Sequence, residues 1–300
     1  MPAAAFAAEP PLGLEVFTPQ RSMVDHIFEV APSVSDAEFH GNFVPVHKDS
    51  DTLSLRQRFA QFQTNNSPLI GQTGIAIPGS LWDLEVGAGY RRRLENGHGL
   101  GFDLSVGSAS DLIHSFHETA ISATAHYQLP SGDKNAWVFL LAYSNNRPFA
   151  DGIPFPGFAY VYHSVQYGLD AVIGLPYASL SYQPAPRWSG HASVYGPTNA
   201  SADWGYQAWE PVRIFGGCAW EQQQWLRAQR PTTADRLFFD DKKWILGTQT
   251  RLFKKILLEL DAAYEFDRRF YEGIRAHNGG LPEANLPSGW AFQGRLTVRL

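Results

Sequence analysis

The stretch Trp82-Asp-Leu-Glu-Val-Gly-Ala-Gly-Tyr90 alternates strictly between two kinds of residue. Its even-numbered positions hold Trp, Leu, Val, Ala and Tyr, whereas its odd-numbered positions hold Asp, Glu, Gly and Gly. Successive side chains of a β-strand point to opposite faces, so a period of two predicts a strand with one apolar face.

The same alternation recurs along most of the chain. Clear examples are 100–107, 117–129, 256–267 and 289–300, and weaker ones are 52–64, 135–145, 178–183, 189–195, 202–209, 211–222 and 241–252. Together with 82–90 they predict an all-β, closed antiparallel transmembrane barrel of about 12 strands, within a range of about 10–14. Segments 157–164 and 168–175 could add one hairpin, giving the upper figure.

Three features place the apolar faces outward, toward lipid. The polar faces are rich in Gly, Ala and Ser as well as in charged residues. Aromatic residues collect near the ends of the apolar stripes, as the two interface girdles of a membrane barrel require. The residues expected in these girdles are Trp82, Tyr90, Trp137, Tyr143, Trp204, Trp209, Trp220, Trp244, Trp290 and Phe292. The third feature is the alternation of short and long linkers.

The linkers predict a topology. Short connections fall at 94–98, 130–134, 184–188, 210–211 and 253–255, and longer ones at 65–81, 110–116, 146–177, 196–201, 223–240 and 268–288. If 52–64 rises from the periplasm, every short connection is periplasmic and every longer one external, which is the arrangement of bacterial outer-membrane barrels. The expected location is therefore the bacterial outer membrane, with outer-membrane lipid as the surrounding partner.

Composition narrows the class further. The chain has 44% hydrophobic and 18% charged residues, a net charge of −5, and no basic run that would follow a phosphate backbone, so nucleic-acid binding is not expected. The single cysteine, Cys218, cannot form an intramolecular disulfide. No stretch of about 18 apolar residues predicts a transmembrane helix. Neither a cofactor nor a metal site is expected.

The N-terminal part is less regular. Residues 1–21 are either a remnant of a secretory signal or a flexible Ala-rich terminus. The barrel is expected over 22–300, and within it 22–51 is a periplasmic segment, a plug or an extra strand.

The faces opposite the apolar stripes are expected to line the barrel interior. Their charged members comprise nine acids and seven bases: Arg56, Arg58, Asp83, Glu85, Arg91, Asp103, Glu118, Asp203, Arg213, Glu221, Arg251, Glu259, Asp261, Glu265, Arg295 and Arg299. Such a mixed set suggests paired charges in a narrow or filled interior, or the lining of a channel for polar solutes. End-to-end alignment of the last two strands would place Asp261 opposite Arg295. A register shifted by two would instead give Arg295 either Glu259 or Ala263.

The second half resembles outer-membrane β-barrel families of unknown function. The resemblance rests on 153–160 (Ile-Pro-Phe-Pro-Gly-Phe-Ala-Tyr), 173–184 (Ile-Gly-Leu-Pro-Tyr-Ala-Ser-Leu-Ser-Tyr-Gln-Pro) and 267–273 (Asp-Arg-Arg-Phe-Tyr-Glu-Gly), and it extends over residues 50–300. It implies a porin-like barrel assembled by the barrel-assembly machinery through the C-terminal strand, and it carries no substrate or catalytic residue. The last residue is Leu300, where such barrels usually have Phe.

Three functions remain. The leading hypothesis is a passive channel for small polar solutes. The alternative is a structural or anchoring barrel with a blocked lumen. An outer-membrane hydrolase is less favoured, because its best candidate residues, Asp111, His114, Ser115 and His117, are more typical of a polar loop. No catalytic residue is assigned, and homo-oligomers or protein partners stay open.

Overall fold

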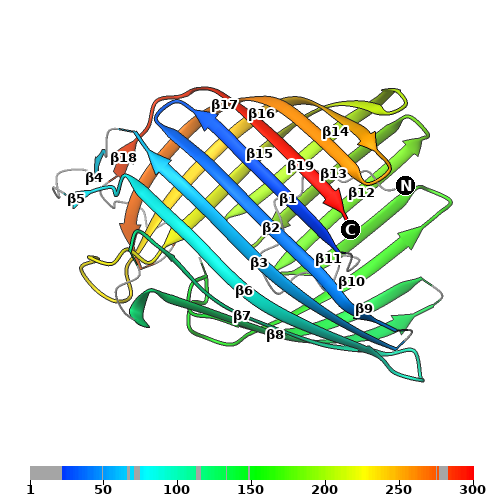
Figure 1. Cartoon of the computed structure of the whole chain (residues 1–300). Coiled ribbons are helices and arrows are strands. Elements are labelled where there is room, and N and C mark those ends of the chain that lie inside the picture. Colours follow the sequence, from blue (N-terminus) through cyan, green and yellow to red (C-terminus); the bar gives the residue numbers. More distant parts are fainter. Residues whose placement is uncertain are drawn as a thin grey trace.

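The chain forms a closed antiparallel β-barrel. The structure is a computed structural model that describes residues 22–48, 50–65, 68–70, 75–112, 116–132, 134–147, 149–274, 276 and 283–300. Strand β1 pairs with β2 on one side and with β19 on the other, so the sheet closes on itself without a free edge (Figure 1). Closure satisfies the backbone N–H and C=O groups of every wall strand, which is the condition for a β-structure in lipid.

Sixteen strands make the wall. They are β1 (Met23–Ala31), β2 (Val34–His47), β3 (Asp51–Thr64), β6 (Ser80–Arg93), β7 (Gly99–Ser110), β8 (Thr119–Ser131), β9 (Asn135–Ser144), β10 (Phe155–Ser164), β11 (Leu169–Leu175), β12 (Tyr177–Ala185), β13 (Trp188–Tyr195), β14 (Asn199–Trp209), β15 (Val212–Trp225), β16 (Arg236–Phe253), β17 (Ile256–Gly273) and β19 (Gly289–Arg299). Four shorter elements are β4 (Leu69–Ile70), β5 (Ile75–Ala76), the 3-10 helix η2 (Phe116–Glu118) and β18 (Glu283–Asn285), which pairs with the outer end of β17.

The predicted barrel is confirmed, but the predicted number of strands, about 12, is wrong. Two hairpins account for the difference. Residues 23–47 form two strands, β1 and β2, rather than a plug, a periplasmic segment or a single extra strand, and 155–175 form β10 and β11, the additional hairpin that segments 157–164 and 168–175 had left open.

Both missing hairpins have a blurred alternation. In β1 the outward face carries His26 and the inward face carries Ile27, so the polar and apolar positions are partly exchanged. In β10 the inward positions hold Phe155, Ala159 and Val161, so both faces are apolar. A strand that packs its inner face against apolar neighbours loses the period-two signal.

The two ends of the barrel differ. Both Met23 and Arg299 lie at the end where the links between strands are short, such as 186–187 and 254–255; we call it the short-turn end. At the opposite, long-loop end lie the links 65–79, 111–118, 145–154, 226–235 and 274–288, interspersed with tighter connections such as Pro32–Ser33.

The outer face of the wall is a belt of exposed apolar side chains. Phe28, Val86, Leu141, Leu246 and Phe292, on five different strands, each expose between 52% and 65% of their surface. A contiguous apolar surface of this extent marks a membrane-facing region. The aromatic residues expected at the interfaces all lie on this outer face by strand register, and several contact each other, for example Tyr264 with Trp290 at 5.6 Å between ring centroids.

No helix among the described residues is long and apolar enough to cross a membrane.

Candidate functional site: the barrel interior and its outer mouth

Strand register fixes which side chains face the interior. Residues that pair directly across neighbouring strands share one face of the sheet, so the inward face can be followed around the whole wall. It places on the inner side all of the predicted lumen residues except Glu118. Glu118 ends η2, before β8 begins, and its carboxylate lies 3.5 Å from the Arg230 guanidinium in a different loop. The prediction that Glu118 belongs to a strand is wrong.

The last two strands do not align as first expected. Glu259, not Asp261, lies opposite Arg295, and Asp261 lies opposite Gln293. The alternative register, shifted by two residues, is the one observed.

Further inward charges were missed by sequence reasoning. They are the carboxylates of Asp25, Glu29, Asp36, Glu38, Asp170, Asp241 and Glu272 and the cations of Arg93, Lys243 and Arg268. The alternation in β2, with Asp36 and Glu38 between Ala37 and Phe39, could have revealed two of them. Arg268 was hidden by the irregularity between Asp240 and Lys242, which shifts the register of β17 by one residue. With these additions, carboxylates clearly outnumber cations on the inner face.

Three arginine–aspartate pairs lie on the inner face, two of them among β3, β6 and β7 and the third on β14 and β15, on the other side of the barrel. Arg56 lies 3.2 Å from Asp103, Arg58 lies 2.9 Å from Asp83, and Arg213 lies 2.6 Å from Asp203. Pairing of this kind offsets much of the cost of holding ionised groups away from bulk water.

The inner face of β15, β16, β17 and β1 is richer in acids. Lys243 lies 2.9 Å from Glu221 and 3.5 Å from Glu29, although Glu29 is on β1, three strands away around the wall. Arg268 lies 3.0 Å from Glu265 and 3.6 Å from Asp241. Long side chains therefore reach across the interior here, and each cation is shared between two carboxylates.

Toward the long-loop end the interior becomes apolar. Phe62 of β3 contacts Trp225 of β15, Phe239 of β16 and Phe270 of β17, with ring centroids 5.3, 5.1 and 6.0 Å apart. Leu81 belongs to the same buried cluster. Because β3 is six strands from β15, these rings bridge distant parts of the wall and fill that part of the barrel.

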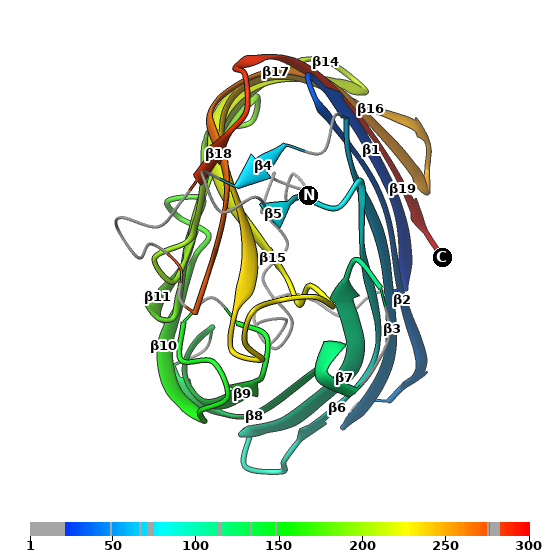
Figure 2. The same cartoon turned by 90° about the vertical axis from the view of Figure 1, so that its left-hand side faces the viewer.

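The link after β15 crosses the outer mouth. Leu226 forms backbone contacts with β7, which lies eight strands from β15 in either direction around the wall and so on the opposite side. The Leu226 N–H donates to the Ala109 carbonyl at 2.6 Å, and the Ser110 hydroxyl donates to the Leu226 carbonyl at 2.6 Å. Figure 2, viewed from the long-loop end, shows β15 running across the opening toward β7. We call residues 226–235 the crossing segment.

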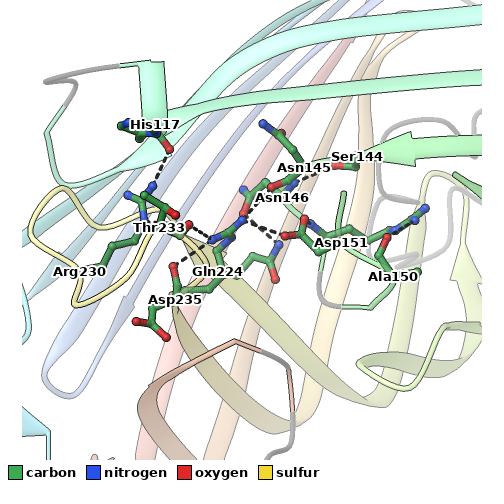
Figure 3. A network of polar contacts seen from close by, with 12 residues as sticks. His117, Ser144, Asn145, Asn146, Ala150, Asp151, Gln224, Arg230, Thr233 and Asp235 are labelled. Carbon is green, nitrogen blue, oxygen red and sulfur yellow. Dashed lines mark hydrogen bonds and ion pairs between the residues drawn. The ribbon is translucent and has the colours of Figure 1, made fainter. Parts of the chain in front are cut away.

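Side chains hold the crossing segment to two other loops. The Ala228 N–H donates to the Asp111 carboxylate at 2.7 Å. Arg230 donates to the carbonyl of His117 at 2.6 Å and lies 3.5 Å from Glu118 (Figure 3). At the start of β16, Arg236 donates to the Asp151 carboxylate at 2.9 Å. The mouth is thus spanned by a hydrogen-bonded strap rather than by a loosely packed loop.

Two guanidinium groups in these loops are perturbed. Burial lowers the pKa of Arg236 below its ordinary value, with the Asp151 carboxylate acting in the opposite direction. Burial also lowers the pKa of Arg147, whose guanidinium donates to the carbonyls of Phe149 and Ala150 at 2.8 and 2.7 Å. Both groups donate hydrogen bonds to the loop between β9 and β10, Arg147 to Phe149 and Ala150 and Arg236 to Asn145 and Asp151.

The residues weighed as a hydrolase site are only partly described by the structure. Of the proposed hydrolase cluster, His114 and Ser115 lie outside the described residues, and Asp111 accepts a hydrogen bond from Ala228. The described part of the chain contains no group of three or more His, Cys, Asp or Glu side chains arranged to hold a metal ion. On the inner face, Ser181 and His191 approach to 2.9 Å, but His191 has no hydrogen bond to Asp203, the acid beside it.

Comparisons with known proteins return only distant similarity. No protein-family model matches the sequence, and no curated protein sequence matches it. Among solved structures, the toluene transporter TodX of Pseudomonas putida aligns with a TM-score of 0.39 at 9% identity, over 96% of this chain and 91% of that one. An outer-membrane channel from Pseudomonas putida F1 gives 0.35 at 11% identity, over 94% and 96%. A mutant porin from Rh. blastica gives 0.34 at 8% identity, over 93% and 99%. At TM-scores this low, the similarity does not extend to any function for this chain.

Proposed function

We propose that this chain is an outer-membrane channel for small polar solutes whose external mouth is narrowed by the crossing segment. The observation that carries the proposal is the contrast between the two faces of the wall. The outer face carries exposed apolar side chains on strand after strand, and the inner face carries charged ones. That distribution suits a wall with lipid outside and water or polar solute inside.

The orientation follows from the two ends. The short turns, the start of β1 and the end of β19 all lie at the short-turn end. In bacterial barrels the end with short turns is the periplasmic side. The crossing segment then lies on the external side. A solute entering from outside would meet the strap first, then the apolar cluster around Phe62, and then the charged part of the interior.

Barrel size supports the proposal. Eight-stranded barrels are filled by their own side chains, whereas sixteen-stranded porins enclose an aqueous channel. This wall has sixteen strands, so its interior can be closed only where other parts of the chain fill it. Among the described residues, the strap and the apolar cluster fill it at the long-loop end.

A second candidate is an anchoring barrel with a blocked lumen. The specific observation in its favour is the pair of hydrogen bonds between Leu226 and the opposite wall, with the apolar cluster beneath them. The two candidates differ in one respect: a channel must open at some time, and an anchor need not.

Single-channel recording of the purified, refolded protein in a planar bilayer separates the two. The channel predicts discrete conductance steps, with closed intervals that shorten when the strap is weakened. The anchor predicts that the protein inserts and stays silent even when the strap is removed. Insertion is checked independently by heat-modifiable mobility and by protease protection of the strands.

A further inference from the structure

The surplus of carboxylates is concentrated around two cations. Five acids, Glu29, Glu221, Asp241, Asp261 and Glu265, surround Lys243 and Arg268; we call these seven residues the acidic cluster. Each of the two cations already contacts two carboxylates. In the three Arg–Asp pairs elsewhere on the inner face, Arg56 and Arg213 each contact one aspartate, and Arg58 contacts Glu38 as well as Asp83, so these pairs do not supply a positive charge to offset this surplus.

Asp261 is the least well paired member, because the cations that act on its carboxylate are Lys243, which already contacts two other carboxylates, and Arg295, which lies opposite Glu259. It faces inward from β17 and only 8% of its surface is exposed. Its side chain makes neither a hydrogen bond nor an ion pair with any residue that the structure describes. Its neighbours on the adjoining strands are Gly247 and Gln293, and neither carries a charge. No side chain fits at position 247 to pair with Asp261, because a Cβ added to Gly247 would lie only 2.6 Å from the Asp261 Cβ.

Glu259, two residues along the same strand, is paired through its Oε2 atom, whereas its Oε1 atom has no hydrogen-bond partner among the described residues. It accepts a hydrogen bond from the Gln249 amide at 2.7 Å, and Arg295 is its partner across the sheet. An ionised carboxylate buried without such partners is costly, and a cation from solution removes the cost. The arrangement therefore favours a positively charged occupant beside Asp261.

We infer that the channel selects cations, and that small cations bind in passage at Asp261 within the acidic cluster. This inference rests on the proposed channel function and adds the class of solute. Because the described residues offer no chelating group, the occupant is a mobile cation, such as a hydrated alkali metal ion or a small amine, and not a resident metal. A pore whose lining has an excess of one charge favours ions of the opposite sign.

The test is the reversal potential of the refolded protein in a KCl gradient across a planar bilayer. A unit charge acting at about 4 Å in water changes the occupancy of an ion by about fivefold. We expect K⁺ to permeate more readily than Cl⁻, and D261N to lower the permeability ratio by about fivefold. The conservative variant D261E should keep the ratio of the unmodified protein, which separates loss of charge from loss of fold.

Asp267 provides a matched control. It is an acid on the same strand, pairs with Lys242 near the outer end and is more than a third exposed. D267N should leave the permeability ratio unchanged. If the unmodified barrel stays closed, the same series is run with R230A, which weakens the strap without touching the acidic cluster.

The outcomes are distinguishable. Silence in every background refutes the channel itself, and the selectivity with it. Conductance without preference for K⁺, or with preference for Cl⁻, overturns the inference and leaves the channel standing. Cation preference that D261N does not change overturns the assignment of the binding position to Asp261.

Discussion

The strap across the outer mouth makes a quantitative prediction through Arg230. Its guanidinium donates to the His117 carbonyl at 2.6 Å and lies 3.5 Å from the Glu118 carboxylate, and the side chains of both Arg230 and Glu118 are 4% exposed. A hydrogen bond to a charged group contributes about 1.5–3 kcal/mol. Arg230→Ala should therefore weaken the attachment of the crossing segment to the loop before β8 by about 3 kcal/mol.

The weaker attachment of the crossing segment should change how often the channel is open. Every 1.4 kcal/mol is a factor of ten in an equilibrium, so about 3 kcal/mol raises the ratio of open to closed barrels by about 100-fold. The backbone hydrogen bond from Leu226 to Ala109 and the strand pairing of the wall do not involve Arg230, so both should stay in place. The assay is the open probability of single channels in a planar bilayer.

Arg187→Ala is the matched control for this experiment. Arg187 is also an arginine in a link between strands, but it lies at the short-turn end and donates one hydrogen bond, to the Tyr206 hydroxyl at 3.2 Å. Its removal should leave open probability unchanged. If Arg230→Ala folds and inserts as well as Arg187→Ala but opens no more often, the strap does not control the mouth and the reasoning is refuted.

Three further predictions concern stability, each measured as a shift in the urea unfolding midpoint in detergent or lipid. Trp225→Ala removes the ring that bridges to Phe62 and should cost about 3–5 kcal/mol; no loss would mean that the apolar cluster is not packed. Arg213→Ala leaves the buried Asp203 without its 2.6 Å partner and should cost about 3–5 kcal/mol, whereas Arg58→Ala, at a side chain 33% exposed, should cost about 1 kcal/mol or less; equal costs would contradict the assigned burial. Leu246→Arg, on the apolar belt, should cost about 2–4 kcal/mol in lipid, whereas Phe116→Arg, 94% exposed in the η2 loop, should be neutral, and the reverse order would place the membrane elsewhere.

Much of the wall could be predicted from local sequence. Where a strand has lipid on one face and polar groups on the other, as in 82–90 and 256–267, the period of two determines both the strand and the direction of each side chain. The prediction that short links lie at one end of the barrel and longer links at the other rests on the same segments. The signal weakened wherever an inner face was apolar, as in β10, because burial against neighbouring side chains removes the contrast between faces.

The candidate site could be predicted only in part. Individual inward charges such as Arg56 and Asp103 follow from strand alternation, but their partners depend on register, and the register of the last two strands was off by two residues. Arg268 was out of reach because β17 holds one extra residue opposite Asp240–Lys242, which changes which of its residues face inward. An irregularity of this kind is set by how neighbouring strands fit and leaves little trace in one strand's sequence.

By itself, then, the sequence determined that this protein is a lipid-facing β-barrel with a charged interior, since both properties are local and repeat every second residue. The tertiary structure alone decided that the wall has sixteen strands, that Lys243 meets Glu29 across three strands, and that Asp261 lies opposite Gln293 rather than opposite a cation. It also decided that the link after β15 spans the outer mouth and bonds to β7 on the opposite side. These contacts join residues far apart in the chain, and closure of the barrel is the physical event that brings them together.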